Sequence, residues 1–273
     1  MSWFGTDVRH LVLWGVVVLA LWALAAYFLL PIAWTHHQRQ PRLAAVPMVT
    51  RTRQGIAGDP INVGLVGAEE DIIRAMHAAG WMPADPVTLK SSIAIIGSVL
   101  LRRPDPKAPV SPLYYDHRVE DLAFEKEVGR SADRRDHVRF WKVLDRGEEG
   151  RPVWLGAATY DRGVGLSHYT GQVTHHIGPD IDAVRTLLID DLKAAKMVEA
   201  IYQVTGIGPT INGRNGGGDR YYTDGEVWIA RLVVGGKANP DPPQTLPPPP
   251  FVAAKDAVWQ GIGNIVGAEN DAE

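Results

Sequence analysis

Hydrophobic residues fill the beginning of the chain and predict a helix that crosses a membrane. No charged side chain lies between Leu11 and Trp34, and this length matches the roughly 20 residues that cross a bilayer core. A cleaved signal peptide is the alternative, because Ala23-Leu24-Ala25 offers small residues at a suitable spacing. The apolar run continues well beyond that point. We therefore predict an uncleaved anchor within residues 1–40, with a span over about 11–34 that contacts the lipid bilayer.

After a polar stretch that we expect to be a juxtamembrane linker over 41–58, the pattern changes between the period of strands and the period of helices. The predicted strands are 61–66, 122–128, 137–144, 153–160, 198–204 and 227–234, and the predicted helices begin at Gly67, at Asp85 and at Pro179. Several consecutive strands indicate an antiparallel meander. We predict one α+β domain over 59–236, with a mixed or mainly antiparallel sheet and about three helices.

The last part of the chain has a different pattern. Seven prolines between Asn239 and Pro250 are typical of an extended linker, so 237–273 is expected to be a Pro-rich linker and a flexible tail. A short helix that touches a membrane or a partner is the alternative, although three glycines weaken it. Its possible apolar side consists of Phe251, Val258, Trp259, Ile262 and Val266.

Composition narrows the classes of function. A chain with 45% hydrophobic and 22% charged residues is globular. The formal net charge is -3 and no block of Lys or Arg is present, so no nucleic-acid partner is expected. The absence of cysteine excludes disulfides, thiolate metal sites and cysteine nucleophiles.

The chain resembles the LssY C-terminal domain family from about Asp59 to Leu232. The strings that carry the resemblance are Asp59-Pro60-Ile61-Asn62-Val63, Ala108-Pro109-Val110-Ser111-Pro112-Leu113-Tyr114, His137-Val138-Arg139-Phe140-Trp141, Leu155-Gly156-Ala157-Ala158-Thr159-Tyr160-Asp161, Gly165-Leu166-Ser167-His168, Thr174-His175-His176-Ile177, Pro179-Asp180 and Asn215-Gly216-Gly217-Gly218-Asp219. Relatives look like stand-alone anchored domains or the tails of multi-pass proteins with DedA-like or phosphatidic acid phosphatase type 2 modules. The resemblance implies a link to envelope lipids and such membrane proteins as partners.

The side of the membrane is indicated in two opposite ways. Four arginines lie between residues 39 and 53, after the span, whereas only Arg9 precedes it, and the positive-inside rule would then put the domain in the cytoplasm. The resemblance implies the periplasmic face, because stand-alone relatives look like signal-anchored proteins. We favour a single-pass protein with an extracytoplasmic domain.

A candidate catalytic site lies just before the predicted helix at Pro179. Three of nine histidines fall within 168–176. If 173–177 is extended, His175 and His176 point to opposite faces, so at most one of them joins His168 and an acid. We predict a catalytic group of His168, His176 and Asp180.

Several kinds of chemistry remain open for this group. Imidazole and carboxylate can hold a divalent metal with an open position for water, although the spacing matches no recognised metal signature and the metal is unknown. Histidine can also act as general acid or base with an aspartate as its orienting partner. Anion binding at the helix start would compete with Asp180 and Asp182. In the simplest alternative, these aspartates stabilise the helix terminus and the histidines bond to neighbouring backbone.

Other polar residues are candidates for ligand binding. Arg139 can bind a carboxylate or phosphate bidentately, or it can be paired within the domain. The glycine-rich segment 213–219 lacks the sequence of a P-loop or a dinucleotide fingerprint, so a structural turn is the alternative there. The predicted ligand-binding residues are Arg139, His175, Asn215, Gly217, Asp219 and Tyr222.

Two functions follow from these observations. The first is an envelope membrane protein whose anchored domain binds a ligand or partner, with a link to membrane lipid handling. The alternative is a membrane-anchored hydrolase of phosphate esters or lipids that uses the His/Asp group, with or without a divalent metal. The hydrolase requires the side chains of His168, His176 and Asp180 to lie close together, whereas the binding function does not.

Overall fold

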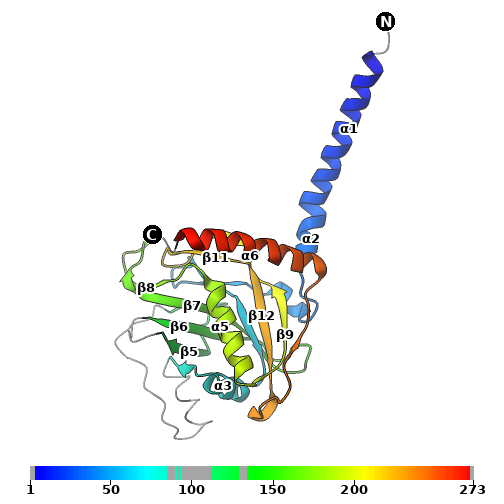
Figure 1. Cartoon of the computed structure of the whole chain (residues 1–273). Helices are drawn as coiled ribbons and strands as arrows, with labels where there is room; N and C mark the ends of the chain where they lie inside the picture. The colour runs from blue at the N-terminus through cyan, green and yellow to red at the C-terminus, as the bar shows by residue number, and fades with distance from the viewer. Residues whose placement is uncertain (1–3, 85–89, 91–92, 94–111, 129–133, 271–273) are drawn as a thin grey trace.

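The computed structural model describes residues 4–84, 90, 93, 112–128 and 134–270 of the chain. It shows one long helix projecting from a domain built on a single large sheet (Figure 1). The predicted helix that begins at Asp85 and the string from Ala108 to Ser111 lie outside the described residues, apart from two isolated positions in the helix.

The projecting helix consists of α1 (Phe4–Leu24), a π-helical turn (Ala25–Leu29) and α2 (Leu30–Trp34). Over Val8–Trp34 it has 27 residues, and no side chain in its most apolar stretch is buried. It is therefore long and apolar enough to cross a membrane, and it contains the span predicted from the sequence.

The large sheet has nine strands among the described residues, in the order β13-β9-β12-β3-β7-β6-β5-β4, with β8 paired to the distal part of β7. Two neighbouring pairs are parallel and the others are antiparallel, which confirms the mixed, mainly antiparallel α+β prediction. The strands are β3 (Val63–Val66), β4 (Met82–Pro83), β5 (Leu122–Glu127), β6 (Arg135–Leu144), β7 (Val153–Leu166), β8 (Val173–Ile177), β9 (Val198–Thr205), β12 (Glu226–Leu232) and β13 (Gln244–Thr245).

Helices α3 (Glu69–Ala78) and α5 (Ile181–Ala194) cover one face of this sheet (Figure 1). Alternation along β6 sends Val138 and Phe140 toward these helices, where they pack with Leu188 in the larger core cluster. Helix α3 has three acidic residues in its first turn and α5 has one, and each helix has a basic residue in its last turn, as the helix dipole favours.

The N-terminal segment that follows the span covers part of the opposite face. Here the structure differs from the predicted linker over 41–58, because the segment forms a 3-10 turn (Pro41–Ala45) and a small hairpin of β1 (Val49–Arg51) and β2 (Ala57–Pro60). Leu43 is fully buried beside Trp141 in the second core cluster. The physical reason is that the part of this face that the segment covers carries the apolar side chains of the second core cluster, which would otherwise be exposed to water.

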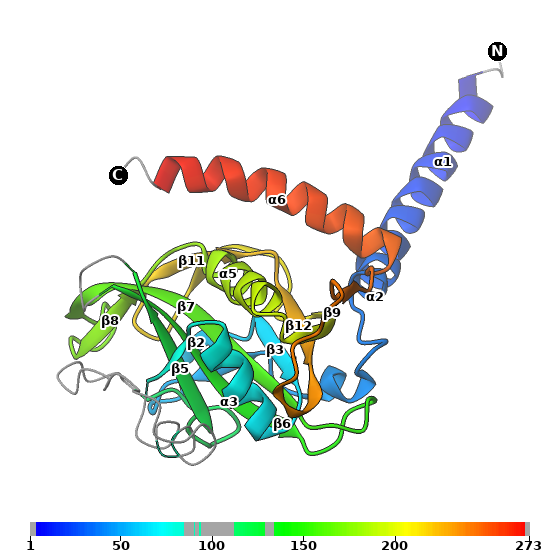
Figure 2. The ribbon, with the colours of Figure 1, turned by 60° about the horizontal axis from the view of Figure 1, so that its bottom comes forward.

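The C-terminal segment also differs from the flexible tail that the prolines suggested. Residues Pro250–Asn270 form helix α6, which runs across the domain (Figure 2). Val252 is fully buried, the Lys255 ammonium pairs with the buried Glu226 carboxylate, and Trp259 Nε1 donates to the carbonyl of Thr223 at 2.6 Å. These contacts fix α6 to the domain, and the proline-rich segment before it adds strand β13 (Gln244–Thr245) to the sheet beside β9.

Candidate functional site

Two hairpins meet at the edge of the sheet. One connects β7 to β8, and the other consists of β10 (Thr210–Arg214) and β11 (Arg220–Thr223). The His168 N–H donates to the carbonyl of Gly217 at 2.8 Å, which joins the two loops. The Asn215 side chain accepts hydrogen bonds from the Gly217 and Asp219 N–H groups at 3.0 and 2.9 Å. The glycine-rich segment is therefore a structured turn.

Gly218 is required where the loops approach each other. Its φ is +91°, a conformation that L side chains rarely adopt, and a Cβ there would lie only 2.7 Å from the Cβ of His168. The turn can bring its backbone this close only because that position has no side chain.

His168, His176 and Asp219 converge at the surface beside this turn. His176 Nδ1 and Asp219 Oδ1 are hydrogen-bonded at 2.7 Å, and His168 Nε2 lies 3.6 Å from the same oxygen. The other oxygen of Asp219 accepts the Ile177 N–H at 3.1 Å, which fixes the carboxylate. Since one ligand atom from each of the three side chains lies within 4.8 Å of the others, the group could hold a metal ion.

The remaining predicted catalytic residue, Asp180, lies elsewhere. Its side chain accepts the N–H groups of Asp182 and Ala183 at 3.1 and 3.0 Å and caps α5. Asp182 bonds the Thr223 hydroxyl at 2.8 Å, and its burial raises its pKa to about 6 although nearby Arg185 opposes the shift. Asp180 thus caps the helix, whereas Asp182 connects the start of α5 to the segment that follows β11.

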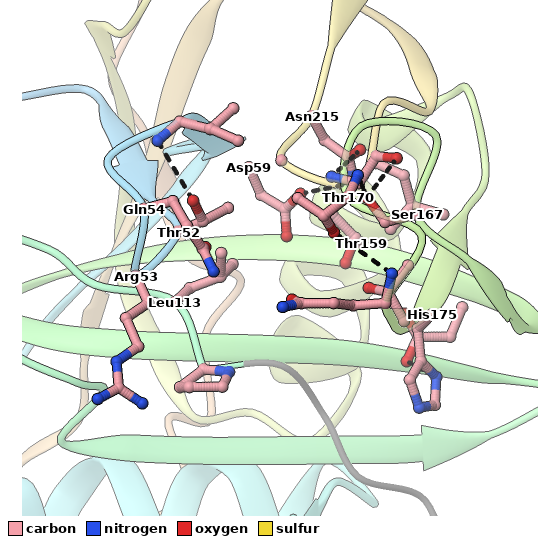
Figure 3. Close-up of a pocket in the computed structure, with 18 of the residues that line it drawn as sticks. Thr52, Arg53, Gln54, Asp59, Leu113, Thr159, Ser167, Thr170, His175 and Asn215 are labelled. Atoms are coloured by element: carbon pink, nitrogen blue, oxygen red, sulfur yellow. Dashed lines mark hydrogen bonds and ion pairs between the residues drawn. The ribbon is translucent and has the colours of Figure 1, made fainter.

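A second polar site lies on the face of the sheet away from α3 and α5. It is a cavity of about 300 Å³ between the strands, the β1–β2 turn and the glycine-rich turn. Figure 3 shows Thr52 and Gln54 on one side of it and Ser167 and His175 on the other. Because β8 is extended, His175 faces this cavity while His176 faces the surface group, as the sequence predicted.

Alternation along the strands also explains why other polar side chains face the cavity. His137 and Arg139 are two positions apart on β6, and Thr159 and Asp161 are two positions apart on β7, so each pair shares a face. All four are buried, as is Asp59 from β2.

Three buried nitrogen atoms at the cavity lack hydrogen-bond partners. They are Nε of Arg139 and both ring nitrogens of His175. Arg139 pairs loosely with Glu120, whose Oε1 is 3.6 Å from that Nε. His175 Nδ1 is 3.2 Å from Asp161 Oδ2, an ion-pair distance without hydrogen-bond geometry. Such unsatisfied groups are rare and call for an explanation.

The environment of the cavity shifts the pKa of its acids and bases in different directions. Burial raises the pKa of Asp59, although Arg139 and Asn215 oppose the shift. Burial also lowers the pKa of His137 to about 3, so its imidazole is neutral at pH 7. For Asp161, burial opposes ionisation, but His175, His137 and Arg139 together lower its pKa. The cavity therefore combines an ionised carboxylate, a guanidinium and a carboxyl that binds a proton more readily.

The predicted ligand-binding residues separate into three places. Arg139, His175, Asn215 and Gly217 line the cavity, and Asn215 Nδ2 donates to Asp59 Oδ1 at 3.2 Å. Asp219 belongs to the surface group instead. Tyr222 lies on the far side of the hairpin, where its N–H donates to the carbonyl of Pro179 at 2.8 Å.

Among the cavity residues missed from the sequence are Asp59, His137, Thr159 and Asp161. The sequence does contain a signal for His137, Thr159 and Asp161. These polar residues lie at alternate positions of two strands, and the positions between them are apolar. Asp59 lies on the short strand β2 (Ala57–Pro60), which spans the boundary between the predicted linker over 41–58 and the predicted domain over 59–236.

Comparison with known proteins identifies the family of the chain. No curated protein and no solved structure matches the chain. The family described as LssY C-terminus matches residues 43–227, which is more than half of the chain and includes the hairpin of β1 and β2. The chain therefore belongs to the LssY C-terminal domain family.

Proposed function

We propose that this protein is a membrane-anchored binding domain that holds an anionic ligand in the cavity lined by β6, β7 and β8. The observation that carries the proposal is the set of buried nitrogens on Arg139 and His175 without hydrogen-bond partners. A buried guanidinium that is poorly paired is costly, and an oxyanion would satisfy it through bidentate hydrogen bonds.

The acids of the cavity narrow the class of ligand. Asp161 and Asp59 would repel a dianion. A singly charged phosphodiester or carboxylate with hydroxyl groups could pair its charge with Arg139 and donate hydrogen bonds from its hydroxyls to the two aspartates. Thr159 and Ser167 add hydroxyls. A volume of about 300 Å³ admits a small headgroup or a free ester, and both offer the same chemistry.

The test is ligand titration of the full-length chain in detergent, by calorimetry, with glycerophosphoglycerol, inorganic phosphate and acetate as probes. Arg139→Gln should weaken binding of the preferred probe at least roughly tenfold, a loss of about 1.4 kcal/mol. The matched control is Arg162→Gln, an exposed arginine on β7. Absence of binding to all three probes at millimolar concentration, or equal binding by both variants, would refute the proposal.

The thermal stability of the same variants separates binding from a structural role. If Arg139 serves to bind a ligand, its replacement should change the stability of the ligand-free protein very little. The Arg139→Gln protein without ligand should therefore have a Tm close to that of the wild type. A fall in Tm similar to that expected from breaking a buried ion pair would identify Arg139 as a structural residue.

Location and partners belong to the same proposal. We also propose that the domain lies outside the cytoplasm, beside DedA-like or phosphatidic acid phosphatase type 2 proteins. The apolar helix and the family support the membrane anchoring on which this rests. Alkaline phosphatase and green fluorescent protein fused after Glu273 would report the side directly. Fluorescence without phosphatase activity would reverse the assignment.

A metal-assisted hydrolase is the second candidate, because His168, His176 and Asp219 converge at the surface. Three such ligands leave a coordination position open for water, which a zinc ion would make nucleophilic. The acid in this version is Asp219, because Asp180 caps α5.

Zinc titration of the full-length chain tests this candidate. Asp219→Asn and His176→Ala should abolish zinc binding and any activity on a panel of phosphate esters. Asp180→Asn is the control, since asparagine is also a good helix cap. Equal zinc content in all the variants would exclude the site.

A further inference from the structure

Helix α6 begins at the base of the membrane-spanning helix and runs crosswise to it (Figures 1 and 2). The Trp34 and Phe251 rings are in contact, with centroids 6.2 Å apart. The domain lies on one side of α6 and α1 extends away from the other side (Figure 1). The outward side of α6 thus faces the region where α1 would enter a bilayer.

Among the residues of α6 whose burial is described, the two charged ones lie on the opposite side from the one expected for a helix in water. Lys255 and Asp256 both point toward the domain and are 7% exposed. A surface helix of a soluble protein normally presents its charged residues to solvent. The exposed residues of α6 whose burial is described are Pro250, Phe251, Ala253, Ala254, Ala257, Val258, Gln260, Gly261 and Ile265, and none of them is charged.

The larger apolar side chains on this outward side are well exposed. Val258 and Ile265 are 64% and 66% exposed, and Phe251 is 43% exposed. They lie at intervals of seven residues, so they share one side of the helix over four turns. This side has no cover in the described part of the chain.

We propose that α6 lies flat in the surface of the lipid bilayer, with Phe251, Val258 and Ile265 among the lipids. The inference rests on the membrane anchoring by Val8–Trp34, because the end of that span fixes the depth at which α6 begins. Aromatic rings such as Trp34 and Phe251 prefer this interfacial level. An uncharged, apolar outward side suits an in-plane helix, whereas the polar inward side binds the domain.

This arrangement would determine the orientation of the domain. A single span allows the domain to swing about its linker, but a helix of 21 residues that lies along the surface holds it in one orientation. At about 1.5 Å per residue, α6 extends roughly 30 Å over the membrane surface.

The chain has no cysteine, so single cysteines can be introduced and spin-labelled without background. Val258→Cys and Ile265→Cys would be labelled in the full-length chain, reconstituted in vesicles of phosphatidylethanolamine and phosphatidylglycerol. Paramagnetic relaxation by oxygen, which concentrates in lipid, is compared with relaxation by a water-soluble nickel chelate. Val18→Cys in the span and Val119→Cys, which is 50% exposed on the domain, give the lipid and water references.

Labels at positions 258 and 265 should favour oxygen over nickel and resemble the label at position 18. Labels that resemble the one at position 119 would overturn the inference. Low accessibility to both reagents would mean that protein covers the helix, and it would also overturn the inference. A water-exposed label at position 18 would refute the anchoring itself, which distinguishes that failure from a failure specific to α6.

Discussion

Replacement of Lys255 by methionine tests how α6 is attached to the domain. The Lys255 ammonium pairs with Glu226, whose side chain is fully buried at the end of the sheet. Burial raises the pKa of Glu226 from 4.5 to about 7, and Lys255 acts against that shift. Methionine retains the length of the side chain and removes the charge, so the pKa of Glu226 should rise well above 7.

The expected loss of stability depends on pH. A carboxyl with a raised folded-state pKa destabilises the fold as pH rises above its unfolded value of 4.5, and in the wild type this loss levels off near pH 7. In the Lys255→Met variant, the loss of stability continues to grow above pH 7. At about pH 8.5, a further 1.5 units at about 1.4 kcal/mol per unit gives about 2 kcal/mol of additional loss. At about pH 6, where Glu226 is mostly protonated in both proteins, the ionisation of Glu226 adds almost nothing.

Urea unfolding of the full-length chain in detergent micelles, followed by tryptophan fluorescence, measures this difference at the two pH values. The double variant Lys255→Met with Glu226→Gln should regain the part of the stability that Glu226 costs at the higher pH, because the buried Glu226 carboxylate is then absent. Asp256 lies 3.1 Å from Lys255, and its loss of pairing acts in the same direction. A destabilisation by Lys255→Met that is equal at both pH values would refute the reasoning.

Three further predictions concern the domain. Burial lowers the pKa of His137 to about 3, so protonation of the unfolded chain should remove about 2 kcal/mol of stability as pH falls from 6.5 to about 5, and urea unfolding of His137→Gln should show a smaller loss. Asn62→Ala should cost about 3 kcal/mol by urea unfolding, because the buried amide bonds two carbonyls and one N–H of β7 and α5. A chain that starts at Thr35 should be soluble and folded by size-exclusion chromatography and circular dichroism, whereas one that starts at Pro41 should unfold about 1 to 3 kcal/mol more easily, since it loses the hydrogen bond from Gln40 to Tyr202.

Most of the domain could be predicted from the sequence because its elements have a strong period. The helix expected from Pro179 to about Lys196 is α5 (Ile181–Ala194), and the strands expected at 198–204 and 227–234 match β9 and β12 within two residues. These segments pack against neighbours on one or both sides, so their apolar positions repeat regularly.

The two flanking segments could not be predicted in the same way. Residues 41–58 carry only a few buried side chains, and their position depends on partners far along the chain, such as Tyr202 for the neighbouring Gln40. Helix α6 is held by the charged pair of Lys255 and Glu226, which has no signature in a local pattern. Contacts between distant polar residues are therefore what the sequence pattern leaves undetermined.

The candidate sites show the same division between local and distant information. The opposite directions of His175 and His176 follow from the extended backbone and could be predicted. The acid next to His176 could not, because Asp219 is 43 positions away and is brought there by the β10–β11 hairpin. Asp180 is nearer to His176 in the sequence, but its side chain accepts the N–H groups at the start of α5 rather than bonding to His176.

The turn from Asn215 to Asp219 physically connects the two candidate sites. Asn215 bonds Asp59 in the cavity, and Asp219 bonds His176 in the surface group, while the Asn215 side chain fixes the N–H of Asp219. Strand β8 separates the sites by no more than its own thickness, since adjacent histidines face each one. A metal ion that reoriented Asp219 would therefore act on the same turn that positions Asn215 at the cavity. If both proposed sites are occupied in the cell, zinc should change the affinity of the cavity for its anion, and the anion should change the affinity for zinc by the same factor.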